Sequence, residues 1–154
     1  MRSQLVWGTL AFGAPALLVN AAPAGAHHAF GAEFDADAPL QLRGKIVKLE
    51  WVNPHSWIHI EVEEADGSKV VWMIEGGTPN VLVRRGLRRE CLPIGTEIIV
   101  DGFQAKDHTL KRANGRDITF ADGRKFFVGS SGTGAPDDGA ETRARANRAE
   151  DGRC

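Results

Sequence analysis

Histidine is the residue type in this sequence best suited to bind a metal, and His27 and His28 stand side by side behind an apolar run that ends in small residues. Such a run is typical of a secretory signal that is cleaved after a small residue. Cleavage after Ala26 would make His27 the first residue, whose amine and imidazole chelate one Cu(II) in square-planar geometry, with His28 adjacent. Cleavage after Ala24 would expose Gly25-Ala26-His27, which suits Cu(II) or Ni(II). Both outcomes favour copper, and the alternative is a pair of exposed histidines that bind nothing.

A third candidate metal ligand is His55, which follows Pro54 in an expected turn. In an extended strand His55 and His59 would lie roughly 13 Å apart, so the two cannot hold one ion together. We therefore expect His59 to be solvated or hydrogen-bonded. The sequence contains no Cys-x-x-Cys or His-Glu-x-x-His spacing, which removes the stronger zinc signatures. The predicted metal ligands are His27, His28 and His55.

Aromatic and basic residues form a second group that could bind a ligand. Trp51, Trp57 and Trp72 lie in or beside expected strands, where they could stack on an extended polymer. Arg84 and Arg85 stand near the end of an expected short helix and could meet a phosphate or a sulfate. The alternative is structural, because cations complement a helix carboxyl end and tryptophans close small cores. The candidate ligand-binding residues are Trp51, Trp57, Arg84 and Arg85.

Signatures of an enzyme are missing from the sequence. It has no Gly-x-Ser-x-Gly and no phosphate loop before a helix. Glu61, Glu63 and Glu64 are neighbouring carboxylates, and we interpret them as a solubilising strand face rather than an acid/base pair. The formal net charge of −1 produces no overall field that would attract nucleic acid. We expect neither catalysis nor a nucleic-acid partner.

The sequence divides into four segments. Residues 1–26 are the expected signal peptide; a membrane anchor would need about 20 predominantly apolar residues, and Pro15 and Asn20 interrupt the run. We expect a periplasmic protein with no membrane span after cleavage. Residues 27–39 form an N-terminal arm, residues 40–129 the folded domain, and residues 130–154 a disordered polar tail without aromatic or large aliphatic residues. Cys91 and Cys154 could pair after export, but we expect Cys91 to pack as a small apolar residue and Cys154 to be loose.

The segment 40–129 has the alternation of strands. Its apolar positions change parity near Ile46, which predicts a β-bulge. Turns at Asp66-Gly67 and Asp122-Gly123 predict two hairpins, and Thr78 with Pro79 predicts the start of a short helix that ends near Gly86. The order of these expected strands and the helix along the chain predicts a mainly β fold. We expect a small five-stranded barrel of the oligonucleotide/oligosaccharide-binding type with one short helix between strands three and four. A generic antiparallel sandwich would leave that helix unexplained.

Four segments of the chain resemble an uncharacterised family of exported bacterial proteins, which is catalogued as a domain of unknown function. The matching residues are His27-His28-Ala29-Phe30 with Glu33-Phe34-Asp35, Glu50-Trp51-Val52-Asn53-Pro54-His55-Ser56-Trp57, Pro79-Asn80 running to Arg84-Arg85-Gly86, and Asp122-Gly123-Arg124-Lys125 before Gly129-Ser130-Ser131. The resemblance covers roughly residues 1–131. It implies a periplasmic location and no established enzymatic activity.

Together these patterns predict a soluble periplasmic binding or accessory module whose partner is another exported protein or a small ligand. The alternative is a periplasmic copper-binding protein that uses His27, His28 and His55. A third hypothesis is a protein that binds an anionic polymer through its arginines and Trp57.

Overall fold

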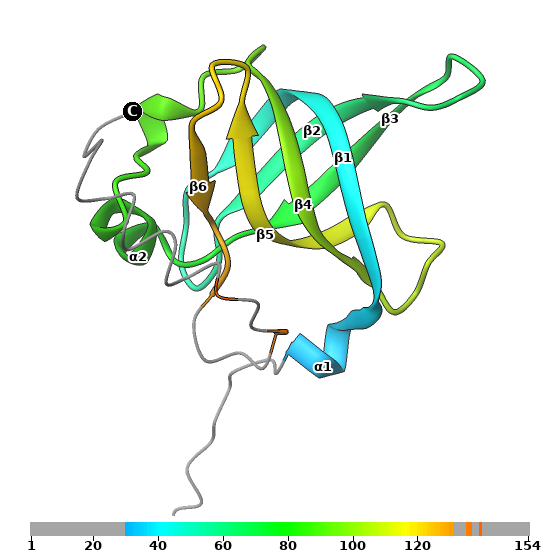
Figure 1. Ribbon diagram of the computed structural model, residues 1–154, viewed down its shortest axis with the longest axis horizontal. Helices are drawn as coiled ribbons and strands as arrows, with labels where there is room; N and C mark the ends of the chain where they lie inside the picture. Colours follow the sequence, from blue (N-terminus) through cyan, green and yellow to red (C-terminus); the bar gives the residue numbers. More distant parts are fainter. Residues whose placement is uncertain (1–29, 131–134, 137–138, 140–154) are drawn as a thin grey trace, which may run out of the picture.

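Strands dominate the part of the chain that the structure describes, which is residues 30–130, 135, 136 and 139 of a computed structural model (Figure 1). The elements are α1 (Phe30–Glu33), β1 (Phe34–Glu50), β2 (Trp57–Glu63), β3 (Lys69–Glu75), α2 (Pro79–Arg84), a 3₁₀ turn (Arg89–Cys91), β4 (Glu97–Ala105), β5 (Arg112–Phe120) and β6 (Lys125–Phe127). The fold is therefore mainly β, as the sequence predicts. The expected signal peptide, His27, His28 and most of the expected tail lie outside the described residues.

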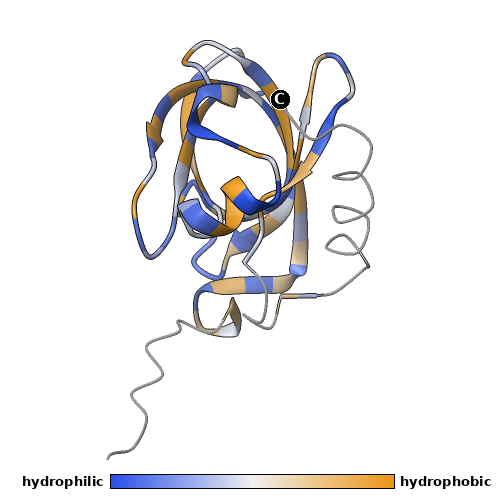
Figure 2. Cartoon of the chain, turned by 90° about the vertical axis from the view of Figure 1, so that its left-hand side faces the viewer, coloured by the Kyte–Doolittle hydropathy of each residue, from blue (hydrophilic) through white to orange (hydrophobic). Residues whose placement is uncertain are grey.

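The strands form one sheet whose hydrogen bonds return on themselves. The sheet order is β3-β2-β1-β4-β5-β6, and β3 also pairs with β5. The β3–β5 pairing is parallel and short, whereas the other pairings are antiparallel. The hydrogen bonds thus run in a ring through β1, β2, β3, β5 and β4, and Figure 2 shows the sheet curled around that ring. The structure has six strands rather than the expected five, since the three-residue β6 pairs with β5.

The local signals in the sequence correspond to real turns and irregularities. The β1–β2 register shifts between Ile46 and Lys48, which confirms the bulge predicted near Ile46. The β2–β3 hairpin turns at Gly67, whose φ of 83° is open to glycine and rare for other residues. The β5–β6 hairpin turns in the same way at Gly123, with φ of 86°.

The short helix α2 follows β3 in the chain and begins where the sequence predicts. The Thr78 side chain accepts a hydrogen bond from the Val81 amide, and Pro79 occupies the first turn, where its missing N–H costs nothing. Gly86, with φ of 90°, ends the helix. The helix buries Leu82 in the core, so it covers one open side of the curled sheet (Figure 2).

The core lies inside the ring of strands and is built mainly of aliphatic side chains, to which every long strand contributes. Each of these contributes about 1.5–3 kcal/mol when fully buried. The buried members are Ile46, Ile58, Ile60, Trp72, Ile74, Leu82, Leu87, Cys91, Leu92, Ile98, Val100, Ala113, Ile118, Phe120 and Val128. Because the inward residues alternate with outward ones, the opposite face of each strand is free to carry polar groups.

A second, smaller apolar cluster fixes α1 against the sheet. The Phe30 ring packs 5.7 Å from that of Phe34 and 5.4 Å from that of Phe103 (centroid to centroid), with Ala105 beside them. β1 begins at Phe34, so the last part of the segment 27–39, which the sequence assigns to an arm, is helix and strand. The β1–β4 register is irregular between Phe34 and Pro39, although Phe34 still pairs with Ala105, and such an irregularity bends a strand locally.

Cys91 differs from its expected state. It is buried at the end of the 3₁₀ turn, as a small apolar residue would be, but it is disulfide-bonded. The expectation of a free thiol is therefore wrong, because it treated burial and pairing as alternatives.

None of the helices in the described part of the chain is long and apolar enough to cross a membrane.

Candidate functional site

Five polar or aromatic side chains from distant parts of the sequence meet on the outer face of the sheet. They are Glu33 of α1, His55 of the β1–β2 loop, Trp57 of β2, Glu75 of β3 and Arg112 of β5. We call these five residues the junction cluster. In sequence they span 80 positions, and only the fold brings them together.

The strand register places three of the five side by side. Trp57 pairs with Glu75 across β2 and β3, and the parallel β3–β5 pairing sets Arg112 beside Met73, two residues before Glu75. The intervening residue Ile74 is fully buried in the core. Because successive side chains of a strand point to opposite faces, Trp57, Glu75 and Arg112 share the outer face.

Arg112 is the centre of the junction cluster. Its Nη2 lies 2.9 Å from Oε2 of Glu33 and 3.7 Å from Oε2 of Glu75. Its guanidinium carbon lies 4.5 Å from the centroid of the Trp57 ring, a cation–π contact. One guanidinium thus joins α1, β2 and β3. Its Nε is buried without a hydrogen-bond partner, so the cluster holds an unused donor.

Glu75 is a carboxyl group buried among these charges, with only 8 % of the residue exposed. Burial raises the pKa of Glu75 above its ordinary value, and the nearby Glu33 carboxyl raises that pKa further. His55, Arg112 and a hydrogen bond donated by Asn114 at 3.4 Å act in the opposite direction without reversing the shift. A negative charge on Glu75, in addition to the one on Glu33, is therefore less favourable here than it would be at an exposed strand end.

The β1–β2 loop delivers His55 to Glu75. Backbone hydrogen bonds hold the loop from both sides of Ser56: its N–H donates to the carbonyl of Gly77 at 3.1 Å, and its carbonyl accepts from Gly76 at 2.8 Å. The His55 Nδ1 lies 3.6 Å from Oε1 of Glu75, is buried and makes no hydrogen bond, while 22 % of the side chain is exposed. One nitrogen of this ring consequently faces a carboxylate inside the site.

The structure separates the predicted aromatic and basic residues. Trp57 belongs to the junction cluster, and Trp51 packs partly buried against the core. Trp72 is 6 % exposed and lies on the core face, opposite Trp57, so the tryptophans do not form one platform. Arg84 is exposed at the end of α2, and the Arg85 guanidinium lies 4.6 Å from the Phe127 ring centroid and donates to the Gly129 carbonyl.

Of the three predicted metal ligands, the structure describes one. His55 lies in the junction cluster, while His27 and His28 fall outside the described residues. His59 is buried, with Nε2 3.0 Å from Oε1 of Glu50, and fits the hydrogen-bonded role expected for it. Among the residues that the structure describes, no group of three or more His, Cys, Asp or Glu side chains is arranged to hold a metal ion.

Sequence reasoning missed Glu33, Glu75 and Arg112. Glu75 ends the apolar run of β3, a position where a carboxylate stands out, and that signal could have drawn attention to it. Arg112 gives no such signal, because it stands outside the segments that alternate clearly. Its importance depends on the parallel β3–β5 pairing, which no local pattern predicts.

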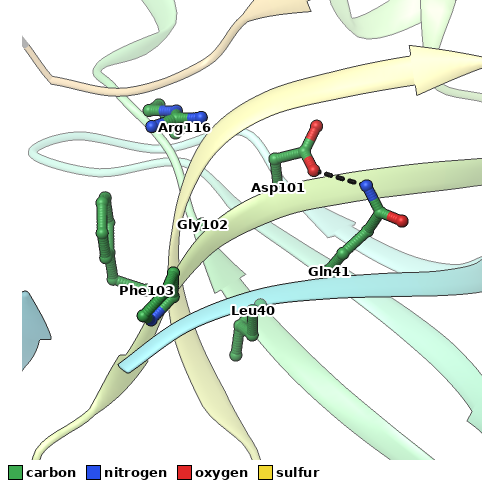
Figure 3. A pocket seen from close by; sticks show the side chains of 7 residues that line it. Leu40, Gln41, Asp101, Gly102, Phe103 and Arg116 are labelled. Carbon is green, nitrogen blue, oxygen red and sulfur yellow. Dashed lines mark hydrogen bonds between the residues drawn. The ribbon is translucent and has the colours of Figure 1, made fainter. Parts of the chain in front are cut away.

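A separate hollow of about 290 Å³ lies between β1, β4 and β5 (Figure 3). It is lined by Pro39, Leu40, Gln41, Asp101, Gly102, Phe103 and Arg116. Gln41 donates to Asp101 at 2.7 Å across its rim, and the Arg116 guanidinium lies 5.9 Å from the Phe103 ring centroid. None of the residues predicted as ligands lines this hollow, so the junction cluster is the candidate site.

Comparison with known proteins covers most of the folded part of the chain. None of the curated proteins matches this sequence. The model of one protein family, described as "Family of unknown function (DUF6152)", matches residues 16–114. That match includes all five residues of the junction cluster. Since it spans more than half of the sequence, this chain belongs to the family of unknown function DUF6152.

Proposed function

We propose that this protein is an exported, non-enzymatic binding or accessory module whose binding site is the junction cluster. Its partner is a small ligand or another exported protein. The observation that carries the proposal is the meeting of α1, β2 and β3 at Arg112, which bonds Glu33, approaches Glu75 and lies over the Trp57 ring. The β1–β2 loop joins them through His55, which faces Glu75.

The order of the strands supports an assignment to the oligonucleotide/oligosaccharide-binding type of barrel. The ring runs β1-β2-β3-β5-β4, and α2 stands between β3 and β4 in the chain. Barrels of that type bind ligands on the face of strands two and three and with the loops before strands two and five. His55, Trp57 and Glu75 lie in the β1–β2 loop, β2 and β3, and Arg112 directly follows the β4–β5 loop. This position of the residues supports the assignment of the junction cluster as the binding site.

The chemistry of the junction cluster supports ligand binding. Two buried nitrogen atoms, Nδ1 of His55 and Nε of Arg112, make no hydrogen bond. A buried donor without a partner costs about 1–3 kcal/mol, a cost that formation of the sheet alone does not require. The partly exposed Trp57 and Arg112 offer a flat surface beside these donors.

Export is supported by the signal pattern of residues 1–26 and by the disulfide of Cys91. Disulfides form and persist outside the cytoplasm and are rare within it. The first discriminating measurement is the intact mass of the full chain produced in a Gram-negative host and isolated from the periplasmic fraction. We expect a product that lacks residues 1–26 or 1–24, and a full-length product in the cytosol would contradict export.

Native mass spectrometry of the same exported protein tests the binding site. We expect wild-type protein to retain a bound molecule or partner that Trp57→Ala loses, because that substitution removes the surface beside Arg112. Val71→Ala is the matched control, since Val71 is an exposed apolar residue of β3 opposite Glu61 and away from the junction cluster. Equal retention by both variants would contradict the site, and turnover of a substrate that depends on His55 or Glu75 would contradict the non-enzymatic role.

A further inference from the structure

Residues 83–94 run from α2 through the 3₁₀ turn toward β4, and we call them the arginine segment. They include four arginines and one acidic residue: Arg84, Arg85, Arg88, Arg89 and Glu90. The segment is thus positively charged, although the formal net charge of the whole chain is −1. Because the protein as a whole has no positive field, attraction of an anionic partner has to come from a local group of charges such as this one.

Three of these arginines, Arg84, Arg88 and Arg89, are exposed and have no carboxylate partner within the described part of the chain. Many cations elsewhere on the fold lie beside a carboxylate, as in the pairs Arg43 with Glu97, Lys48 with Glu50 and Lys69 with Glu61. A neighbouring carboxylate cancels much of the attraction that a cation exerts on another anion. The three guanidinium groups of the arginine segment keep that attraction.

Buried leucines hold the arginine segment against the core. The Leu87 amide donates to the Leu82 carbonyl and the Gly86 amide to the Val83 carbonyl, each at 3.0 Å, the pair of bonds that commonly ends a helix at a glycine. Leu82 and Leu87 are fully buried, and Leu92 is 2 % exposed. The exposed residues between these anchors therefore project from a fixed backbone, on the side of the fold where α2 faces the viewer in Figure 2.

The end of α2 accounts for only part of this charge. A cation at the carboxyl end of a helix complements the helix dipole, so Arg84 has a structural role. Arg88 and Arg89 come after Gly86, beyond the helix, and Arg89 begins the 3₁₀ turn. Because cations are favoured at the last turn of a helix and not at the first, the dipole does not explain these two residues.

Exposed apolar side chains stand at both ends of the arginine segment. Val83 is 44 % exposed and Ile94 is 63 % exposed. A soluble polyanion offers only charges, whereas a bilayer surface offers phosphate groups to arginines and hydrocarbon to aliphatic side chains. Guanidinium groups also match phosphate oxygens in geometry. This combination of residues favours an anionic lipid surface over a soluble polymer.

We propose that the arginine segment docks the protein on the surface of a membrane rich in anionic phospholipids. Arg84, Arg88 and Arg89 bind the phosphate groups, and Val83 and Ile94 contact the boundary of the acyl chains. This surface shares no residue with the junction cluster, so the protein can be attached to a membrane while the junction cluster binds its own partner.

Sedimentation with vesicles tests the docking surface. Protein recovered from the periplasmic fraction is mixed with vesicles of equal parts phosphatidylglycerol and phosphatidylcholine, or of phosphatidylcholine alone. We expect binding to the anionic vesicles only, and weaker binding as added salt screens the charges. The triple variant Arg84→Gln, Arg88→Gln, Arg89→Gln should bind on the order of 100-fold more weakly, because each basic residue near an anionic surface contributes about a fivefold factor. Equal binding to both kinds of vesicle would overturn the proposal.

A second triple variant removes the same charge from the strands: Arg43→Gln, Lys48→Gln, Lys69→Gln. These side chains are more than half exposed and already lie beside carboxylates, so this control should bind nearly as wild type. Equal losses in both triple variants would mean that binding follows net charge, which would overturn the arginine segment as the docking surface. All proteins compared have the same N-terminus, so the result does not depend on where the chain is cleaved.

Circular dichroism checks that each variant folds. If the first triple variant folds poorly, the double variant Arg88→Gln, Arg89→Gln replaces it, because it keeps the cation at the end of α2. Its binding should fall on the order of 20-fold, and binding equal to wild type would overturn the proposal.

Ile94→Ser measures the apolar part of the contact. It should weaken binding to the anionic vesicles several-fold and leave the salt dependence unchanged, because an aliphatic side chain no longer leaves water. Val71→Ser is the matched control, since Val71 is 48 % exposed on β3, outside the arginine segment. Retention on heparin that depends on the arginines, without binding to vesicles, would overturn the lipid surface and identify a soluble acidic polymer as the partner.

Discussion

Two groups of charged side chains lie on the outer face of this sheet, and they are built in opposite ways. One is the junction cluster. The other, which we call the strand cluster, consists of Gln41, Asp101, Asp117 and Lys125. Every residue of the strand cluster lies in a strand of the antiparallel part of the sheet, and the register sets Gln41 opposite Asp101 and Asp101 opposite Asp117. The junction cluster also recruits a helix and a loop that are not part of the sheet.

The difference separates charged groups that stabilise the sheet from charged groups that are available to bind a ligand. In the strand cluster, Lys125 lies 3.4 Å from Asp101 and 3.5 Å from Asp117. Its positive charge is thus shared between two carboxylates that the β4–β5 register places opposite each other. Such pairs stabilise a sheet modestly. In the junction cluster, burial of Glu75 and the unpartnered Nδ1 of His55 are costs that the sheet alone does not require. We infer that the costly arrangement is the functional one.

The largest expected effect is loss of the guanidinium at the centre of the junction cluster. Arg112→Met leaves the Glu33 and Glu75 carboxyls close together with no counter-charge, and we expect it to destabilise the fold by about 2 kcal/mol, since Arg112 is one third exposed. Urea unfolding midpoints measure this loss. Lys125→Met in the strand cluster should cost at most about 0.5 kcal/mol, because Arg116 also lies 3.5 Å from Asp117.

A double variant tests the cause of that loss. Glu75→Gln combined with Arg112→Met removes one of the two opposed carboxylates and should restore part of the stability. Strict additivity of the two single effects would mean that Arg112 stabilises the fold only through packing on Trp57 and Phe34. The comparison between the two clusters would then lose its electrostatic basis.

A smaller effect is expected in the pH dependence of stability. Folding raises the pKa of Glu75 above its ordinary value of 4.5, so the folded state binds that proton more tightly than the unfolded state. The contribution is present below about pH 4.5 and is lost as the pH rises through the raised pKa. Wild-type protein should therefore lose stability relative to Glu75→Gln over that interval, as followed by unfolding midpoints. Glu63→Gln, an exposed carboxyl at the far end of β2, controls for the loss of one charge.

The smallest expected effect concerns α1, which carries Glu33 to Arg112. A Cβ added at Gly31 meets nothing within 4 Å, so Gly31→Ala should raise stability by up to about 0.5 kcal/mol through helix propensity and reduced chain entropy. Gly67→Ala is the matched control, because it has the same open surroundings but a φ of +83°, and it should destabilise by about 1 kcal/mol. Equal changes in thermal midpoint for the two variants would mean that α1 is not helical in solution.

Much of the sheet could be predicted from local patterns, and little of the candidate site could. The bulge near Ile46, the hairpins at Gly67 and Gly123 and the start of α2 at Pro79 each depend on residues a few positions apart. His55 and Trp57 were predicted because their types stand out in one short motif. Their binding roles stay predictions, and the partnership of His55 with His27 and His28 stays one too because those two residues lie outside the described structure.

By itself the sequence determined the bulge near Ile46, the two hairpin turns and the start of α2, since alternation of apolar residues, capping groups and glycine dihedrals act over a few residues. Only the tertiary structure decided that Glu75 is buried, that Trp72 and Trp57 face opposite ways, and that Arg112 reaches α1. The physical reason is the parallel β3–β5 contact, which joins segments far apart in the chain. That contact brings Arg112 of β5 to Glu75 and Trp57, which the β2–β3 pairing has already set side by side.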